Sequence, residues 1–320
     1  MARRDFHEPP WRDGSETRRD FSDSFMVIGE APLGTGLTSE VWEAIPRNAG
    51  SKESAVAAKI FTQMDAPPDP SITPPPCKVK HEVEILAAAQ GHPGILRLHG
   101  FFWLGSEEVP ICGPGRRPRD CDDGDASASA ADDEAPAPAP PRWCITAELC
   151  TGGCLYDALA AHRVKESEAK VVMEDILGAL VHLHSRSILH RDVKVENVMV
   201  RDDGSHVLAD FGLSCLASDE DAIKKACGSP GYIPPEVLLK QGWREKADVF
   251  AAGVMTYVML ARTLPFRGGD TVEVLRATLS SRLSFSGHAC FDDVTPEFKV
   301  FVRALLSRNH HHRPTAWSSL

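Results

Sequence analysis

Residues 189–212 constrain the fold of this chain more than any other stretch, because they place charged and amide side chains on both sides of one tight turn. The segment reads LHRDVKVENVMVRDDGSHVLADFG. Two apolar runs flank Asp203-Gly204, which is a strong hairpin signal. Asn197 precedes the hairpin and Asp210 follows it, so the hairpin would fold the two side chains back beside each other, near Asp192 and Lys194. The stretch therefore predicts a base, a cation and two oxygen ligands of the kind that Mg²⁺ prefers. For any single aspartate here, the alternative interpretation is that it is only a turn residue.

A glycine-containing loop precedes this stretch in the sequence. Residues 33–41 read LGTGLTSEV, and a dinucleotide-binding fingerprint at this place would have to open a helix. Val41, Glu43 and Ile45 instead alternate as in a strand. The glycines therefore predict a loop within a β-hairpin, whose backbone N–H groups could approach phosphate oxygens closely.

Lys59 and Glu82 form a second candidate pair. Lys59 ends the apolar strand pattern VAAK, so its side chain is either held inside by an anion or reaches outward to solvent. Glu82 lies in the middle of a predicted helix, within HEVEIL. A strand lysine that pairs with a glutamate on a neighbouring helix could hold the α- and β-phosphates of a nucleotide.

The hydrophobic pattern changes near residue 150. Short β-type runs fill residues 25–61, a helical pattern spans 78–90, and ILRLHGFFW and WCITAEL predict two further strands. After Gly152-Gly153, helical patterns dominate: one has Ser167 as its predicted N-cap, and another, DVFAAGVMTYVMLA, is apolar on all faces. The sequence thus predicts a β-rich first part and an α-rich second part.

Three segments have the composition of disordered chain. Residues 1–24 are predicted to be a flexible tail, and residues 64–77 contain six prolines. Residues 104–142 combine an acidic block with APAPAPP. We predict that 64–77 and 104–142 are disordered insertions, because they cannot bury enough apolar surface to offset the entropy of ordering.

Charge and cysteine content exclude several classes of protein. The 320 residues carry a formal net charge of −10, which argues against nucleic-acid binding and against binding to an anionic membrane. The nine cysteines show no paired spacing, and no secretory or transit peptide is recognisable at the start. We therefore expect reduced thiols and a cytoplasmic or nuclear protein that works as a monomer.

Taken together, the motifs resemble those of the eukaryotic protein kinase superfamily and occur in its order. After the hairpin the chain continues with CGSPGYIPPE, DVFAAGVMTYVML and RPTA, and the resemblance covers about residues 25–320. Lys194, two residues after Asp192, resembles the serine/threonine type. AELCTGGCLYDAL and the segments just quoted resemble the calcium/calmodulin-dependent and calcium-dependent kinase group.

This resemblance implies an α+β, two-lobed protein kinase fold. The small antiparallel β-rich N-lobe, with one key helix, would span residues 25–147. A hinge would follow at 148–152, and a larger, mainly α-helical C-lobe would span 153–320.

The resemblance also implies roles for individual residues. Asp192 would orient the substrate hydroxyl and accept its proton, while Lys194 would neutralise charge on the transferred γ-phosphoryl group. Lys59, held by Glu82, would contact phosphates of ATP, and Mg²⁺ would be held by two residues, Asn197 and Asp210. The residues expected around ATP are Leu33, Gly34, Thr35, Gly36, Val41, Ala57, Lys59, Glu148, Cys150 and Met199. Glu236 and Arg313 would form a buried ion pair.

Regulation is partly implied as well. In this family, an arginine directly before the catalytic aspartate is typical of kinases whose activation segment is ordered by a phosphate. Arg191 stands at this position. Here Lys225 stands closest to the position of the usual phosphorylated threonine. We hypothesise that the carboxylates of Asp219, Glu220 and Asp221, or no group at all, take the place of the phosphate.

The predicted function is that of an ATP- and Mg²⁺-dependent serine/threonine kinase acting on protein substrates. One alternative is a pseudokinase scaffold whose acidic, proline-rich loop docks partners, but the intact catalytic motifs argue against it. Another is a small-molecule phosphotransferase of kinase-like fold, which should lack the PGYIPPE segment. A calcium-sensing regulator, in trans or in a longer product, is compatible with the resembled group.

Overall fold

The computed structural model describes residues 20–36, 38–47, 55–62, 77–104, 111–112 and 142–320. By its internal contacts the chain divides into two compact units. The N-terminal unit comprises Met1–Val83 and Arg97–Leu149, and the C-terminal unit comprises Glu84–Leu96 and Cys150–Leu320. No helix among the described residues is both long enough and apolar enough to cross a bilayer.

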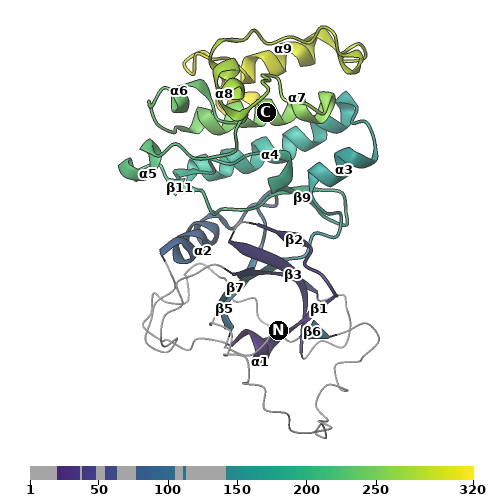
Figure 1. Cartoon of the computed structure of the whole chain (residues 1–320), viewed down its shortest axis with the longest axis vertical. Coiled ribbons are helices and arrows are strands. Elements are labelled where there is room, and N and C mark those ends of the chain that lie inside the picture. Colours follow the sequence, from purple (N-terminus) through teal and green to yellow (C-terminus); the bar gives the residue numbers. More distant parts are fainter. Residues whose placement is uncertain (1–19, 37, 48–54, 63–76, 105–110, 113–141) are drawn as a thin grey trace, which may run out of the picture. The chain divides into compact units, whose positions relative to one another are not determined.

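The N-terminal unit is built on one twisted sheet with strand order β5-β7-β4-β3-β1-β6, with β2 paired to β3 (Figure 1). All neighbours run antiparallel except β1 and β6. The alternation of buried and half-buried residues along β4 reflects the two faces of the sheet. The strands are β1 Phe25–Ile28, β2 Gly34–Thr35, β3 Ser39–Pro46, β4 Val56–Phe61, β5 Leu98–Leu104, β6 Ile111–Cys112 and β7 Arg142–Glu148.

Helix α2, Cys77–Ala89, packs against one face of this sheet. Val79 and Val83 from the helix join a buried cluster with Trp103, Trp143 and Ile145 from the strands. The predicted helix over 78–90 is therefore confirmed, and the sheet and helix together match the predicted antiparallel N-lobe with one key helix.

The predicted flexible tail is wrong for its last residues. Phe21–Ser24 form the short helix α1, and the carboxylate of Asp20 accepts a hydrogen bond from the Ser22 N–H at 2.8 Å. Phe21 has no exposed surface and stacks on Phe25 at 5.5 Å between ring centroids. Burial of this aromatic ring offsets the cost of ordering the segment. Residues 1–19 lie outside the described residues.

The predicted disordered insertions are also wrong at their ends. Cys77 begins α2, Leu104 ends β5 and is buried, and Arg142 begins β7. Ile111–Cys112, inside the second insertion, form β6 and pair with β1 in register Val27↔Ile111. These residues are ordered because the sheet supplies backbone partners for them. The remainder of both insertions lies outside the described residues.

The C-terminal unit is mainly helical, as predicted. Its central helix α7 is buried on nearly every side, and its Gly253 is required because a Cβ there would lie 2.7 Å from the Cβ of Leu305. The helices are α3 Leu155–Ala161, α4 Glu166–Ser185, α5 Glu220–Lys224, α6 Pro235–Leu238, α7 Glu245–Ala261, α8 Thr271–Ser280 and α9 Pro296–Leu305. Short strands and 3-10 turns complete the unit: β8 Ile188–Leu189, η2 Val195–Asn197, β9 Val198–Val200, β10 His206–Leu208, β11 Cys215–Leu216, η3 Ala289–Phe291 and η4 Trp317–Ser319.

The start of α4 differs from the prediction. The predicted apolar stripe is buried, but the N-cap is Lys165 and not Ser167. The carboxylate of Glu168 reaches back to accept a hydrogen bond from the Lys165 N–H at 2.7 Å. This bond satisfies a donor that the helix itself leaves unpaired, so the helix begins two residues earlier than the serine suggests.

The boundary between the units also differs from the predicted lobes, because residues 84–96 belong with the C-terminal unit. Leu96 N–H donates to the carbonyl of Leu208 at 3.1 Å, and Leu208 N–H donates to Gly94 at 2.9 Å. His182 on α4 lies within hydrogen-bond distance of the Ala89 carbonyl, at 2.9 Å. The end of α2 and the segment after it are thus tied to α4 and β10, which the sequence pattern did not reveal.

Candidate active site

The predicted hairpin forms and brings Ala209, the residue before Asp210, to Asn197. Strands β9 and β10 pair antiparallel around Gly204, whose φ of +79° suits the turn. The N–H of Ala209 then donates to the carbonyl of Asn197 at 2.8 Å. Asp210, the next residue, has a φ of +58°, a backbone conformation that is costly for a residue other than glycine and is often found at functional sites.

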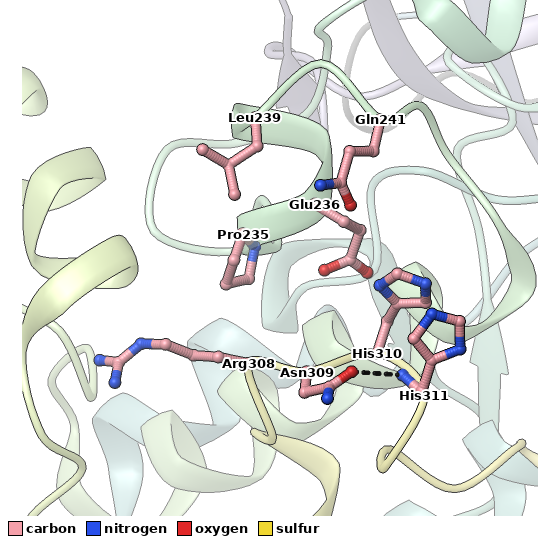
Figure 2. Close-up of a pocket in the computed structure, with 8 residues that line it drawn as sticks. All are labelled: Pro235, Glu236, Leu239, Gln241, Arg308, Asn309, His310 and His311. Atoms are coloured by element: carbon pink, nitrogen blue, oxygen red, sulfur yellow. Dashed lines mark hydrogen bonds between the residues drawn. The ribbon is translucent and has the colours of Figure 1, made fainter.

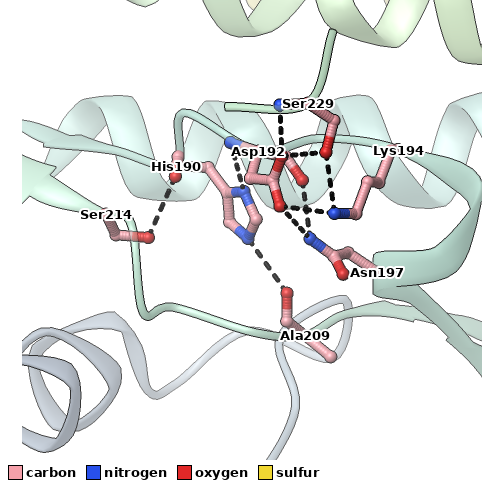
Figure 3. A network of polar contacts seen from close by, with 7 residues as sticks. All are labelled: His190, Asp192, Lys194, Asn197, Ala209, Ser214 and Ser229. Carbon is pink, nitrogen blue, oxygen red and sulfur yellow. Dashed lines mark hydrogen bonds and ion pairs between the residues drawn. The ribbon is translucent and has the colours of Figure 1, made fainter. Parts of the chain in front are cut away.

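Asp192 is the centre of a polar network, which Figure 3 shows. Lys194 Nζ lies 2.8 Å from one carboxylate oxygen, and Asn197 Nδ2 donates to the same oxygen at 3.0 Å and to the Asp192 carbonyl at 2.8 Å. Ser229 donates to the other oxygen twice, from its hydroxyl at 2.9 Å and from its N–H at 3.1 Å. Ser229 Oγ also accepts from Lys194 at 2.8 Å.

This arrangement is chemically specific. The carboxylate of Asp192 already accepts a hydrogen bond from a serine hydroxyl, and a cation lies beside that same hydroxyl. A substrate hydroxyl that took the place of Ser229 Oγ would meet a proton acceptor and a positive charge together. The predicted grouping of Asp192, Lys194 and Asn197 is thus present in the structure.

Asp248 supports the loop that carries Asp192, a role that none of the sequence motifs indicated. Its two carboxylate oxygens accept from the N–H groups of His190 at 3.0 Å and Arg191 at 2.8 Å. His184 Nε2 lies 3.0 Å from it. Asp248 has no exposed surface; burial alone would raise its pKa, but the bonds and charge of His184 outweigh burial and lower the pKa. The available signal was an acidic residue in a helix that is otherwise apolar all round.

His190 is held inside the C-terminal unit. Its ring accepts from the Asp192 N–H at Nδ1 and lies 3.1 Å from the Ala209 carbonyl at Nε2 (Figure 3). Burial lowers the pKa of His190, although the charges of Asp248 and Asp192 oppose the shift. A neutral ring that bridges Asp192 and Ala209 fixes the spacing between the catalytic loop and the segment that precedes Asp210.

In the N-terminal unit, Lys59 and Glu82 form the predicted ion pair. Lys59 is on β4 and Glu82 is on α2, and Lys59 Nζ lies 2.6 Å from Glu82 Oε1. Glu82 is buried, so the pair is largely shielded from solvent. The packing of α2 on the sheet therefore sets the position of the lysine ammonium group.

The glycine loop has the predicted form of a hairpin rather than a helix start. Leu33 N–H donates to Val41 at 2.7 Å, and Gly36 N–H donates to Ser39 at 2.7 Å. Among the described residues, a Cβ at Gly34 would meet no atom within 4 Å, and one at Gly36 would come no closer than 3.5 Å to any atom. Packing against the described residues does not require these glycines, and open space over a glycine backbone fits a ligand that approaches it.

The residues expected around ATP are divided between the two units. The N-terminal unit holds Leu33, Gly34, Thr35, Gly36, Val41, Ala57, Lys59 and Glu148, and the C-terminal unit holds Cys150 and Met199. Glu148 uses its N–H to donate to the Arg97 carbonyl at 3.0 Å. Ala57 pairs with Ala147 in the sheet, so two small side chains lie opposite each other there.

The donor set fits Mg²⁺ held together with phosphate oxygens. The Asn197 amide donates through Nδ2 to the carbonyl and the carboxylate of Asp192, and its amide oxygen is the ligand that a hard cation would take. No group of three or more His, Cys, Asp or Glu that could hold a metal occurs in the part of the chain that the structure describes. An Asp/Asn pair therefore requires further oxygen ligands, and a nucleotide would supply them.

Of the two alternatives stated for Arg191, the structure supports the second, that no carboxylate takes the place of a phosphate. The buried guanidinium donates to two backbone carbonyls instead, to Leu213 at 2.7 Å from Nε and to Ala222 at 2.5 Å from Nη1. Asp219 caps α5 by accepting from Ala222 N–H at 2.9 Å, and Glu220 faces Lys224. The short helix α5 thus brings the Ala222 carbonyl to Arg191.

The predicted ion pair between Glu236 and Arg313 is present. Two bonds join them, from Nη1 at 2.6 Å and from Nη2 at 3.0 Å. Arg313 also donates to the carbonyls of Ser307 and Lys246. The segment that continues from Ser229 into α6 is therefore anchored to the turn that follows α9.

Comparison with known proteins then decides the family. The family model described as "Protein kinase domain" matches residues 28–320, which is nearly the whole chain. The chain belongs to this family. The kinase fold predicted from the motifs is confirmed, and so is the two-part α+β composition.

Curated relatives agree on the type of kinase. The chain is 35% identical over 55% of its length to calcium/calmodulin-dependent protein kinase cmkA of Emericella nidulans, and this match covers 44% of that protein. It is 35% identical over 55% of its length to calcium/calmodulin-dependent protein kinase type I of Schizosaccharomyces pombe, covering 54% of that protein. A CBL-interacting serine/threonine-protein kinase of Arabidopsis thaliana is 34% identical over 52% of the chain and 38% of that protein.

These matches support the resemblance to the serine/threonine type and to the calcium/calmodulin-dependent group. The aligned region spans only about half of each of these relatives, or less.

Proposed function

We propose that this chain transfers the γ-phosphoryl group of ATP to serine or threonine hydroxyls of protein substrates. The observation that carries the proposal is the network at Asp192, in which one carboxylate oxygen accepts a hydrogen bond from the Ser229 hydroxyl while Lys194 donates to the same hydroxyl. Phosphoryl transfer requires mainly positioning and charge neutralisation, and these two side chains supply both. Membership of the protein kinase family supports the assignment.

The other roles follow from chemistry that the site residues can provide. Lys59, oriented by Glu82, would contact phosphates of ATP, and the backbone at Gly34 and Gly36 would approach them. Asn197 and Asp210 would hold Mg²⁺, which when bound would neutralise the phosphates and orient them. Asp192 would hold the substrate hydroxyl and take its proton.

A pseudokinase scaffold is the competing function. The Lys59–Glu82 bond is formed at 2.6 Å, and the Asp192 carboxylate is hydrogen-bonded in a catalytically usable arrangement. A chain selected only for binding has no need to keep both. These two observations favour the enzyme.

A transfer assay separates the two functions. Purified protein is incubated with γ-labelled ATP, Mg²⁺ and a library of serine and threonine peptides. Asp192→Asn and Asp210→Asn serve as blanks, and Asp293→Asn, an exposed aspartate outside the site, serves as the matched control. We expect label with the wild type and the control only. Equal label in the wild type and both blanks would refute the proposal and favour the scaffold.

We further propose that the chain acts as a monomer in the cytoplasm or nucleus, and that a calcium-sensing protein regulates it. The names of two relatives support the second part, since both are called calcium/calmodulin-dependent. The transfer assay repeated with calcium and calmodulin tests this idea. A rate that does not respond to either addition would contradict regulation by that sensor acting in trans.

A further inference from the structure

Residues 217–234, here called the activation segment, are held at both ends within the C-terminal unit. Before the segment, Cys215 of β11 pairs with Leu189 of β8, which leads directly into the catalytic loop. After the segment, Glu236 of α6 lies beside the turn at 308–311 (Figure 2), and its carboxylate is ion-paired. The stretch between these two attachments contains α5, which lies beside β11 (Figure 1).

Ile223 is the one buried residue from Leu216 to Pro230, a stretch that the structure describes in full. It lies on α5 and is 3% exposed. Its side chain belongs to a core cluster with Leu189 and Trp243. The cluster therefore joins α5 to the strand that leads into the catalytic loop. Three half-buried small residues of the segment flank this cluster: Ala217, Ala222 and Cys227.

The end of α5 supplies three backbone carbonyls to other elements. The Ala222 carbonyl accepts from Arg191 Nη1. The Ile223 carbonyl accepts from the Trp243 N–H at 2.9 Å, and the Lys225 carbonyl accepts from Trp243 Nε1 at 3.2 Å. A helix leaves its last carbonyls unpaired, and their partial negative charge favours a cation such as Arg191. All three acceptors lie within two residues of Ile223, so the burial of its side chain keeps them in place.

The chain before α7 is shaped to receive α5. Gly242 has a φ of +84°, and a Cβ there would lie 3.3 Å from the Ile223 carbonyl oxygen. A glycine therefore serves both the backbone conformation and the close approach. Trp243 follows and is buried. Asp248, on α7, then accepts from the Arg191 N–H at 2.8 Å, so the element that receives α5 also holds the catalytic loop.

We propose that Ile223 is a positioning residue for phosphoryl transfer, because its buried side chain anchors the activation segment without a phosphate group. The proposal rests on the proposed function and deepens it. Through the Ala222 carbonyl, Ile223 acts on Arg191, the neighbour of Asp192. Along the chain it acts on Ser229, which donates to the Asp192 carboxylate. Burial of an apolar side chain requires no modification, so folding alone puts the segment in place.

Steady-state kinetics of Ile223→Ala test the positioning role. All proteins are treated with phosphatase first, and rates are measured at a temperature where each is folded. We expect kcat to fall by about tenfold or more, because Arg191 and the segment lose their anchor near Asp192. The KM for ATP should stay within about twofold, since no residue assigned to ATP belongs to the cluster around Ile223. Ile223→Val keeps a branched apolar side chain and should recover most of the lost rate.

Ile176→Ala is the matched control. Ile176 lies on α4, has no exposed surface and is outside the cluster around Ile223. Removing the same atoms there should lower the melting temperature comparably, but should leave the kcat of the folded protein within about twofold. An equal fall in kcat in both variants would show that Ile223 only stabilises the unit, and would overturn the proposal.

Hydrogen exchange tests the anchor without relying on catalysis. In folded Ile223→Ala, the Trp243 N–H and the amides of residues 217–228 should exchange faster than in Ile176→Ala by about tenfold or more. Unchanged exchange, or a kcat equal to that of the wild type, would overturn the proposal. If the wild type transfers no phosphate, the proposed function is refuted, and the exchange comparison still decides whether Ile223 anchors the segment.

Lys225→Glu tests whether the segment needs a negative charge. Lys225 is exposed and stands closest to the position of the usual phosphorylated threonine. Because Ile223 already anchors the segment and Arg191 already binds carbonyls, we expect no gain in rate from the new acid. A gain of about tenfold or more would show that the segment is ordered by charge, and would also overturn the proposal.

Discussion

Replacing Asp248 by asparagine tests whether a buried carboxylate positions the catalytic loop. The two oxygens of Asp248 accept from the N–H groups of His190 and Arg191 at 3.0 and 2.8 Å, and His184 lies 3.0 Å away. An asparagine keeps one oxygen but turns an NH₂ group toward the second N–H. One buried donor then loses its acceptor, and the charge that His184 faces is lost.

The expected loss of stability follows from these contacts. An unsatisfied buried donor costs about 1–3 kcal/mol, and the weakened bond to His184 adds about 1 kcal/mol. We therefore expect the free energy of unfolding to fall by about 2–4 kcal/mol. This leaves the protein folded if its stability is in the usual range of about 5–15 kcal/mol.

Catalysis should suffer separately from stability. Asp192 is two residues from His190, and a misplacement of about 1 Å at a catalytic group can cost about a hundredfold in rate. We expect kcat of Asp248→Asn to fall by about tenfold to a hundredfold at a temperature where the variant is fully folded. The KM for ATP should change little, because Asp248 holds none of the residues assigned to ATP.

Asp175 offers a matched control for this experiment. It also accepts from a backbone N–H and a ring, those of His206 at 3.1 and 2.8 Å, but the hairpin strand that it supports carries no catalytic side chain. Urea denaturation and initial rates are measured for both variants. The reasoning is refuted if Asp248→Asn is as stable and as active as the wild type, or if Asp175→Asn loses the same fraction of kcat.

Four further predictions concern other parts of the site. Lys59→Met should lower the transfer rate by at least about a hundredfold at a temperature where the variant is folded, because it removes the cation expected at the phosphates; residual activity near that of the wild type would contradict it. Glu236→Gln should lower the free energy of unfolding, measured in urea, by about 3–5 kcal/mol. Adding Arg313→Met should restore part of this loss, because no charge is then buried alone. If the losses of the two single variants simply add in the double variant, the two residues do not stabilise the fold as a pair. Burial lowers the pKa of His190 below its ordinary 6.5, so as the pH drops below 6.5 the unfolded chain takes up a proton before the folded chain does, and the free energy of unfolding should fall. His190→Gln should reduce this dependence of the unfolding free energy on pH. An unchanged pH dependence would show that other groups cause it. Because carbonyls hold Arg191, phosphatase treatment should leave the transfer rate unchanged, and a loss of activity would show that a phosphate contributes.

The parts of the fold that the sequence predicted well are those with strong local signals. The hairpin at Asp203-Gly204 needed only a turn and two apolar runs, and the all-apolar helix α7 could only be buried. The catalytic residues were found because their types and spacings match a known family. For the hairpin and for α7, the information lay within about twenty residues of chain.

Apart from the N-cap of α4, the errors have a common physical cause, which is contact between residues far apart in the sequence. Phe21 is ordered by rings 4 and 81 residues away, at Phe25 and Phe102. Strand β6 is ordered by β1, although its surroundings in the sequence are acidic and rich in alanine. Arg191 is satisfied by backbone carbonyls, which no side-chain pattern can reveal, and Asp248 contacts a loop almost sixty residues before it.

The two ends of the sheet have a consequence for solubility. An exposed edge strand can recruit a strand of another molecule and so start aggregation. Here one edge of the sheet is the two-residue strand β6, next to β1. At the other edge, an isolated β-bridge joins Asp20 to Trp103 of β5. A chain shortened to begin after Asp20, or one with Ile111 and Cys112 deleted, would uncover longer edges. Such chains should aggregate more readily even where the catalytic residues are untouched.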